Sequence, residues 1–265
     1  MPSRSIWLVG CGNMGGAMLQ GWLASGVPAE TILVIDPAAK SAPGGVTLLA
    51  APPADRVPDI LVLAIKPQML VDVGPTLPVS STTTVISILA GVEIASLASA
   101  LPGAGAFVRV MPNMPAAIGE GASAVFGPSL DAEGRKAMDA LVAPLGRVEW
   151  VEDESLFHAV TGLSGSGPAF VLRFAEALIA AGVAEGLSPD LAKRLALETL
   201  AGTARLALQS DLSPGALVET VRSPNGTTHA GLVVMDGSDF AETVGKTISA
   251  AAKRSRELAS AAQKG

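Results

Sequence analysis

Residues 10–15 read GCGNMG, and this loop decides how the first part of the chain is interpreted. The apolar run Ile6–Val9 precedes the loop, and the residues from Asn13 to Ser25 show the apolar spacing of a helix. A glycine-rich loop that follows a strand and opens a helix is typical of dinucleotide-binding folds, although it can also be an ordinary strand–helix turn. The context favours a cofactor whose pyrophosphate contacts Gly10, Cys11, Gly12, Asn13, Met14 and Gly15.

Asp36 ends a second predicted strand, Ile32–Ile35, 21 residues after Gly15. An acid at this spacing hydrogen-bonds the adenosine ribose of NAD and disfavours the additional phosphate of NADP. Lys40 lies close enough in the sequence to weaken that discrimination. Because an Asp before Pro37 is also a common turn former, both interpretations of Asp36 stay open. The predicted cofactor is therefore NADPH or NADH.

The first 155 residues alternate short apolar runs with helical patterns, which is the signature of β–α–β units. Continuous apolar runs indicate strands that are buried on both faces of a mostly parallel sheet. A helix is predicted from about Ala132 to Val142. The remaining predicted strands are Ile60–Ile65, Val85–Leu89, Ala106–Val110, Ser123–Phe126 and Val148–Val151.

After about residue 155 the strand patterns end, and alanine and leucine dominate. Ser188 and Ser213 are each followed by proline, which is the pattern of an N-cap with proline at the first helical position. Asp239 is placed to begin a last helix that runs to about Ala262. The predicted fold is α/β, with a Rossmann-like domain at residues 1–155 and an all-helical domain at residues 156–265.

The composition is more apolar than that of an ordinary soluble monomer, with 49% hydrophobic and 16% charged residues. No run of about 18 consecutive apolar residues exists, so a membrane-spanning helix is not expected. An obligate homo-oligomer accounts for the excess better, because such interfaces resemble a domain core cut in half.

Charge and residue counts argue against several classes of function. A net charge of −6 argues against a nucleic-acid partner. One cysteine permits no internal disulfide and fits a reducing cytoplasm, and with two histidines it argues against a metal site. The chain has no tyrosine, which excludes every reductase mechanism that uses a tyrosine as general acid.

Four further segments carry the most specific signal: AIKPQ at 64–68, RVMPNMP at 109–115, TGLSGSGP at 161–168 and SPNGTT at 223–228. Together with the glycine loop they resemble the pyrroline-5-carboxylate reductase family, from about Ile6 to about Leu258. The resemblance implies an enzyme of proline biosynthesis that transfers a hydride from NADPH or NADH to 1-pyrroline-5-carboxylate, forming L-proline. It also implies that the helical domain binds substrate and dimerises, with rings of dimers as a larger assembly.

The resemblance implies a role for each matched residue. Cofactor contacts near the nicotinamide would come from Ala64, Ile65, Lys66, Pro67, Ile88, Leu89, Ala90, Gly91 and Asn113. The substrate would be bound by Glu154, Asp211, Ser223, Gly226, Thr227 and Thr228. The catalytic candidates are Thr161, which would orient the imine nitrogen or a water, and Thr228.

The SPNGTT segment suits a carboxylate, because it can offer two hydroxyls and successive backbone N–H groups without a cation. Serine and threonine beside proline and glycine are also common helix caps, and the two interpretations are compatible. Asn225 stands where the family usually has a glycine, and asparagine tolerates a left-handed backbone. His229 replaces what is commonly an apolar residue, and Asp36 leaves the choice of cofactor open.

Two other functions fit parts of the sequence. A 3-hydroxy-acid dehydrogenase would share the glycine loop and the helical second half, but would need a catalytic lysine there, for which Lys193 is the candidate. A dinucleotide-sensing protein without turnover would need only the cofactor loop. The intact TGLSGSGP and SPNGTT segments favour the reductase.

Overall fold

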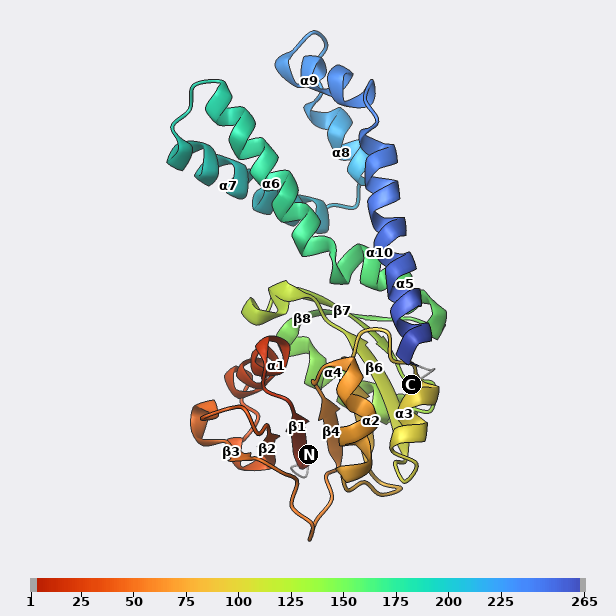
Figure 1. The fold of residues 1–265 in the computed structure, drawn as a ribbon. Helices are drawn as coiled ribbons and strands as arrows, with labels where there is room; N and C mark the ends of the chain where they lie inside the picture. The colour runs from red at the N-terminus through yellow and green to blue at the C-terminus, as the bar shows by residue number, and fades with distance from the viewer. Residues whose placement is uncertain (1–3, 263–265) are drawn as a thin grey trace. The chain divides into compact units, whose positions relative to one another are not determined.

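A computed structural model describes residues 4–262 of the chain (Figure 1), which forms two compact units. The first unit comprises Met1–Ser166 together with Ser249–Gly265, and the second comprises Gly167–Ile248. These units do not coincide with the predicted domains at 1–155 and 156–265, because the residues up to Ser166 and the end of the last helix pack with the sheet. The domain boundary therefore stays a prediction.

Within residues 4–262, eight strands form one sheet in the order β3-β2-β1-β4-β5-β6-β7-β8. Every neighbouring pair is parallel except β6 and β7, which confirms the mostly parallel sheet. The strand Thr47–Leu49 was not predicted, because its three residues lie in a glycine- and proline-rich stretch at the sheet edge. The strands are β1 Ile6–Val9, β2 Ile32–Ile35, β3 Thr47–Leu49, β4 Ile60–Leu63, β5 Thr84–Ser87, β6 Ala106–Met111, β7 Gly121–Phe126 and β8 Gly146–Trp150.

Helices cover both faces of the sheet, because each strand sends alternate apolar side chains to opposite sides. In β1, Leu8 joins a core with helices α1 (Asn13–Ala24) and α4 (Ala132–Val142). Val9 joins a second core with α2 (Leu70–Val73) and α3 (Ile94–Ala100). The indole Nε1 of Trp22 donates to the Leu141 carbonyl at 2.8 Å and so ties α1 to α4.

A buried ion pair joins the sheet to the segment that follows it. Arg109 on β6 donates from Nη1 to Oε1 of Glu154 at 2.9 Å, and the side chains are 5% and 26% exposed. The same Oε1 accepts the N–H of Ile94 at 2.7 Å, at the start of α3. The Arg109 guanidinium also lies 4.3 Å from the ring centroid of Phe157, the first residue of α5 (Phe157–Val160). The Glu154 carboxylate therefore fastens β6 to α3, and the Arg109 guanidinium adds the contact with α5.

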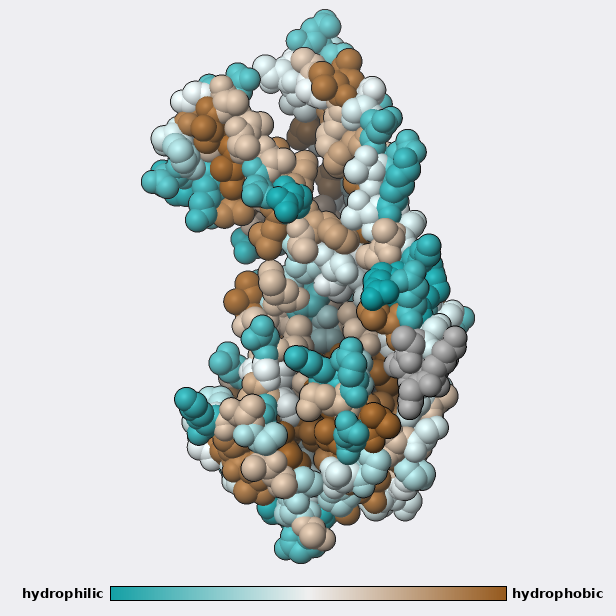
Figure 2. All heavy atoms as spheres, viewed as in Figure 1, coloured by the Kyte–Doolittle hydropathy of each residue, from teal (hydrophilic) through white to brown (hydrophobic). Residues whose placement is uncertain are grey.

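The second unit is helical and buries little of its own apolar surface. Among its described residues, Ala175 and Ala192 are the buried hydrophobic ones, where α6 packs against α7. Many larger apolar side chains on these two helices are exposed, and Figure 2 shows them as brown patches on the surface. The helices are α6 Gly167–Ala184, α7 Pro189–Leu208, α8 Pro214–Val221, α9 Thr227–Asp236 and α10 Phe240–Ala262, of which α10 continues into the first unit.

One helical stretch, Glu154–Ala184, is long and apolar enough to cross a membrane by length and composition. Only 6% of its most apolar window is buried within the chain. The sequence-based expectation of no such helix rested on the lack of an unbroken apolar run. The mean hydropathy of this stretch is nevertheless high enough for a membrane span, although it contains Arg173 and Glu176. Its exposed surface needs a cover, which is either lipid or protein.

We predict that Glu154→Gln lowers the free energy of unfolding by about 2–3 kcal/mol, because it removes the carboxylate that is hydrogen-bonded to the buried Arg109 cation. Glu149→Gln is the matched control, since the Arg147–Glu149 pair is 80% and 63% exposed. We expect that control to change stability by less than about 1 kcal/mol. Urea unfolding followed by circular dichroism measures both, and equal stabilities of the two variants would contradict the structural role of the buried pair.

Candidate functional site

The glycine loop brings α1 against the carboxyl ends of β1 and β4. Gly10 has a φ of +92°, and a Cβ there would lie 2.7 Å from the Ala64 carbonyl oxygen. A Cβ on Gly15 would collide with the Gly10 carbonyl and lie 3.1 Å from the Ala64 Cβ. Side chains at these two positions would therefore push the helix off the sheet.

The start of α1 fits a phosphate group. Gly12 is the N-cap and makes no side-chain cap hydrogen bond, so no side chain satisfies the first N–H groups of the helix. A Cβ on Gly12 would meet nothing within 4 Å, so open space lies in front of this backbone. Free N–H groups and the positive end of a helix dipole together form an anion site. Asn13 and Met14 provide the first of these N–H groups.

The carboxylate of Asp36 closes the loop from the neighbouring strand. Its Oδ2 accepts the N–H of Cys11 at 2.8 Å, and its Oδ1 accepts the N–H groups of Ala38 at 2.8 Å and Ala39 at 3.2 Å. Burial and the nearby Asp36 charge both raise the pKa of the Cys11 thiol. The structure thus places Asp36 beside the glycine loop, as the spacing predicted, and also gives it a turn-forming role.

Two further predicted cofactor segments follow the neighbouring strands of the sheet. Ala64 donates its N–H to the Val9 carbonyl at 2.8 Å, and Ile65, Lys66 and Pro67 lead from β4 into a short 3-10 turn. The residues Ile88, Leu89, Ala90 and Gly91 come directly after β5, which pairs with β4. Because the carboxyl ends of parallel strands meet at one edge, both segments lie at the same edge as the glycine loop.

Asn113 and the TGLSGSGP segment are connected through side chains. Asn113 donates from Nδ2 to the Ser164 hydroxyl at 3.2 Å and accepts the Ala122 N–H on its Oδ1 at 2.9 Å. Thr161–Gly165 form a π-helical turn, a form that is frequent at functional sites. The Thr161 hydroxyl donates to the Phe157 carbonyl at 2.7 Å, so its lone pairs are the part that can receive a hydrogen bond from a ligand.

Sequence reasoning missed the partners of Glu154. Its Oε1 is shared by Arg109 and the Ile94 N–H, so a substrate contact would fall to Oε2. Arg109 could have been noticed as the only charged residue in the apolar strand Ala106–Met111. Burial lowers the pKa of Arg109, and the hydrogen bond that Arg109 donates to Glu154 opposes that effect.

His158 lies next to this ion pair. Its Nδ1 shares a hydrogen bond with the Ser255 hydroxyl of α10 at 3.0 Å. Burial lowers the pKa of His158, and the positive charges of Arg109 and Arg256 lower it further. The neutral form is therefore favoured, which fits a structural role for His158.

In the second unit, Ser223–Gly226 forms a tight turn that leads into α9. The Gly226 N–H donates to the Ser223 carbonyl at 3.0 Å, and Asn225 adopts a left-handed φ of +58°. Gly226 is the N-cap of α9 without a side-chain cap, so the N–H groups of Thr227 and Thr228 are the first of the helix. The turn thus leads directly into a helix start whose first N–H groups have no side-chain cap, an arrangement that can bind a carboxylate.

The other predicted residues of the second unit are exposed. Asp211 lies in the connection between α7 and α8, and Lys193 lies on α7. The structure therefore groups the proposed substrate residues in two places, with Glu154 and Thr161 in the first unit and the others in the second.

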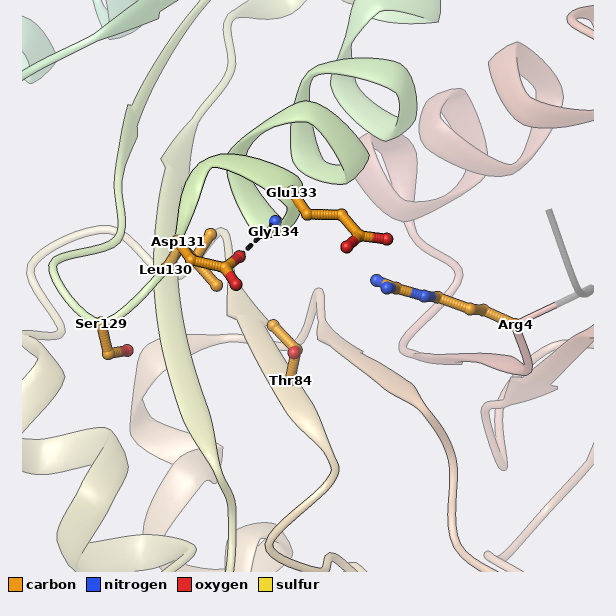
Figure 3. Close-up of a pocket in the computed structure, with 7 residues that line it drawn as sticks. All are labelled: Arg4, Thr84, Ser129, Leu130, Asp131, Glu133 and Gly134. Atoms are coloured by element: carbon orange, nitrogen blue, oxygen red, sulfur yellow. Dashed lines mark hydrogen bonds between the residues drawn. The ribbon is translucent and has the colours of Figure 1, made fainter.

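A cavity of about 350 Å³ lies at the opposite edge of the sheet, beside the amino end of β5 (Figure 3). Asp131 lines it and accepts the Gly134 N–H at 2.7 Å, which caps α4. Figure 3 shows the Arg4 and Glu133 side chains pointing toward one another across it. None of the predicted site residues lines this cavity.

Comparison with known proteins separates the chain into two matched regions. The family described as pyrroline-5-carboxylate reductase dimerisation matches residues 154–258. The family described as NADP oxidoreductase, coenzyme F420-dependent, matches residues 5–91, which include the glycine loop and Asp36.

Proteins named pyrroline-5-carboxylate reductase match this chain over nearly its whole length. A pyrroline-5-carboxylate reductase from Pisum sativum is 37% identical, over 97% of this chain and 96% of the relative. A solved pyrroline-5-carboxylate reductase from Coxiella burnetii superimposes with a TM-score of 0.89 at 30% identity, covering 97% and 98% of the two chains. A pyrroline carboxylate reductase from Plasmodium falciparum, solved with NADP bound, has a TM-score of 0.82 at 28% identity, covering 98% and 99%. By identity, coverage and fold, the chain belongs to the pyrroline-5-carboxylate reductase family.

Proposed function

We propose that this chain is an NAD(P)H-dependent reductase that converts 1-pyrroline-5-carboxylate to L-proline, the last step of proline biosynthesis. The observation that carries the proposal is the combination of a glycine-loop cofactor site with an intact Ser223–Thr228 turn in a member of this family. The decisive assay mixes purified protein with the imine and each reduced cofactor, and follows loss of nicotinamide absorbance. No oxidation of either cofactor would refute the reductase and favour a dinucleotide sensor.

The cofactor supplies the hydride when it is bound, and the chain supplies position. The N–H groups at the start of α1 hold the pyrophosphate, and the segments after β4 and β5 hold the nicotinamide half. A protonated cyclic imine is already a strong electrophile, so orientation does most of the catalytic work. Alignment of bound reactants is worth about 7–11 kcal/mol at best.

The substrate carboxylate is held by the Ser223–Thr228 turn. Ser223, Thr227 and Thr228 offer hydroxyls, and the uncapped helix start offers N–H groups, which together neutralise an anion without a cationic side chain. Thr161 accepts the imine N–H or orients a water, because its own hydroxyl proton is committed to Phe157. Glu154 and Asp211 are assigned to the same substrate with supporting roles.

The exposed helices of the second unit are covered by a second copy of the chain in our proposal. Residues 154–258 match the dimerisation family, and the stretch Glu154–Ala184 lies largely inside them. Arg173 and Glu176 on this stretch would be costly in a bilayer, so protein is the better cover. We propose a dimer as the minimum unit, a ring of dimers as the larger assembly, and a cytoplasmic location that suits a single free cysteine.

Thr228→Ala removes a hydroxyl from the proposed carboxylate site, and we predict that it raises KM for the imine about 10-fold and lowers kcat. The KM for the reduced cofactor should stay the same. Thr220→Ala is the control, because the Thr220 hydroxyl only donates to the Leu217 carbonyl on α8. Steady-state kinetics decide the matter, and unchanged imine kinetics in Thr228→Ala would remove the carboxylate role.

Lys193→Ala separates the reductase from a 3-hydroxy-acid dehydrogenase. Lys193 is the lysine that the rival mechanism needs, and it lies exposed on α7. We expect the variant to keep wild-type activity on the imine. Loss of activity by more than about 100-fold, which is more than a surface substitution explains, would favour the rival.

Leu172→Glu tests the protein cover of α6. Leu172 is 52% exposed in the single chain, so burying a glutamate there should disfavour association and leave the monomer fold intact. We predict a shift from dimer to monomer in light scattering after gel filtration. Val57→Glu is the control, because Val57 is exposed outside the dimerisation segment. A variant that stays dimeric would place the interface elsewhere.

A further inference from the structure

We propose that Asp36 makes this enzyme prefer NADH, by fixing a negative charge where the 2′-phosphate of NADPH would bind. The inference rests on the proposed function and deepens it by naming the electron donor. Membership of the family leaves this point open, since the Plasmodium relative was solved with NADP bound.

Three backbone N–H groups hold the Asp36 carboxylate from two sides. Cys11 of the glycine loop donates to Oδ2 at 2.8 Å, while Ala38 and Ala39 of the following turn donate to Oδ1 at 2.8 and 3.2 Å. A side chain that is tied to both segments cannot swing away to make room for a phosphate.

The same contacts decide which ribose fits. Oδ1 already accepts two N–H groups, whereas Oδ2 accepts only the Cys11 N–H and keeps a second lone pair, so Asp36 can still accept a hydrogen bond from a ribose hydroxyl. A 2′-phosphate needs donors instead, and the N–H groups of Ala38 and Ala39 at this point already donate to Asp36. NADPH would therefore meet a fixed negative charge and two occupied donors.

Lys40 is the one cation in the segment 36–46, and it is the natural rival explanation. Its side chain is exposed, and no ion pair involving it is present among the described residues. An exposed charge is strongly screened by water, whereas Asp36 is half-buried. The local balance therefore stays negative where the adenosine ribose binds.

The test measures binding before activity. Quenching or enhancement of nicotinamide fluorescence gives Kd for NADH and for NADPH on the wild-type protein without substrate. We expect NADH to bind at least about 10-fold more tightly, since one charge pair near a protein surface is worth more than a factor of ten. The ratio of kcat/KM values with the imine should follow the ratio of Kd values.

Asp36→Asn removes the charge and keeps an oxygen that can accept N–H groups. We expect it to move the NADH:NADPH affinity ratio at least about 10-fold toward NADPH. Asp131→Asn is the matched control, because it makes the same change of charge at the opposite edge of the sheet and asparagine caps α4 equally well. The control should leave the ratio unchanged.

Several outcomes overturn the proposal. Equal affinity of the wild-type protein for NADPH and NADH would overturn it directly, even if Asp36→Asn does not fold. An unchanged NADH:NADPH affinity ratio in a folded Asp36→Asn variant would also overturn it. Selective loss of NADPH binding in Lys40→Ala would have the same consequence. If neither cofactor is oxidised with the imine, the proposed function fails, while the two Kd values still decide the role of Asp36.

Discussion

Helix α1 begins against the carboxyl ends of β1 and β4 because Gly10 and Gly15 carry no side chains at the point of contact. The nearest atoms at both positions are backbone carbonyl oxygens, those of Ala64 and Gly10, so the fit cannot be recovered by a rotamer change. It aims the uncapped end of α1 at the edge of the sheet, where the segments after β4 and β5 also arrive. The cofactor site follows from this packing rather than from any cluster of charged side chains.

Charges serve mainly to fasten segments in this protein. Glu154 fastens β6 to α3 through one oxygen, and Asp36 fastens the glycine loop to the turn after β2. The family resemblance predicts a substrate contact at Glu154, the spacing after the glycine loop predicts a ribose contact at Asp36, and each carboxylate keeps at least one lone pair for a ligand. Removing such a residue changes folding and binding together, so only ratios and matched controls can separate the two effects.

Much of the first unit could be predicted, because its strands are continuous apolar runs and its helix starts are local signals. Ile32–Ile35 and Ala132–Val142 match the structure residue for residue. Thr47–Leu49 could not be predicted, since a three-residue edge strand has no pattern of its own. Nor could the Arg109–Glu154 pair, whose members lie 45 residues apart. Spacing placed Asp36 beside the glycine loop, but its three N–H partners depend on the folded turn.

The scarcity of acid–base groups fits the proposed chemistry. The chain has no tyrosine, and one of its two histidines, His158, is held by Ser255 with a lowered pKa caused by burial and by Arg109. A histidine that favours its neutral form near pH 7 is a poor proton donor. The Thr161 hydroxyl is committed to a backbone carbonyl. In the proposed reaction a protonated imine needs none of these groups as an acid, so backbone N–H groups and fixed carboxylates would suffice to position it.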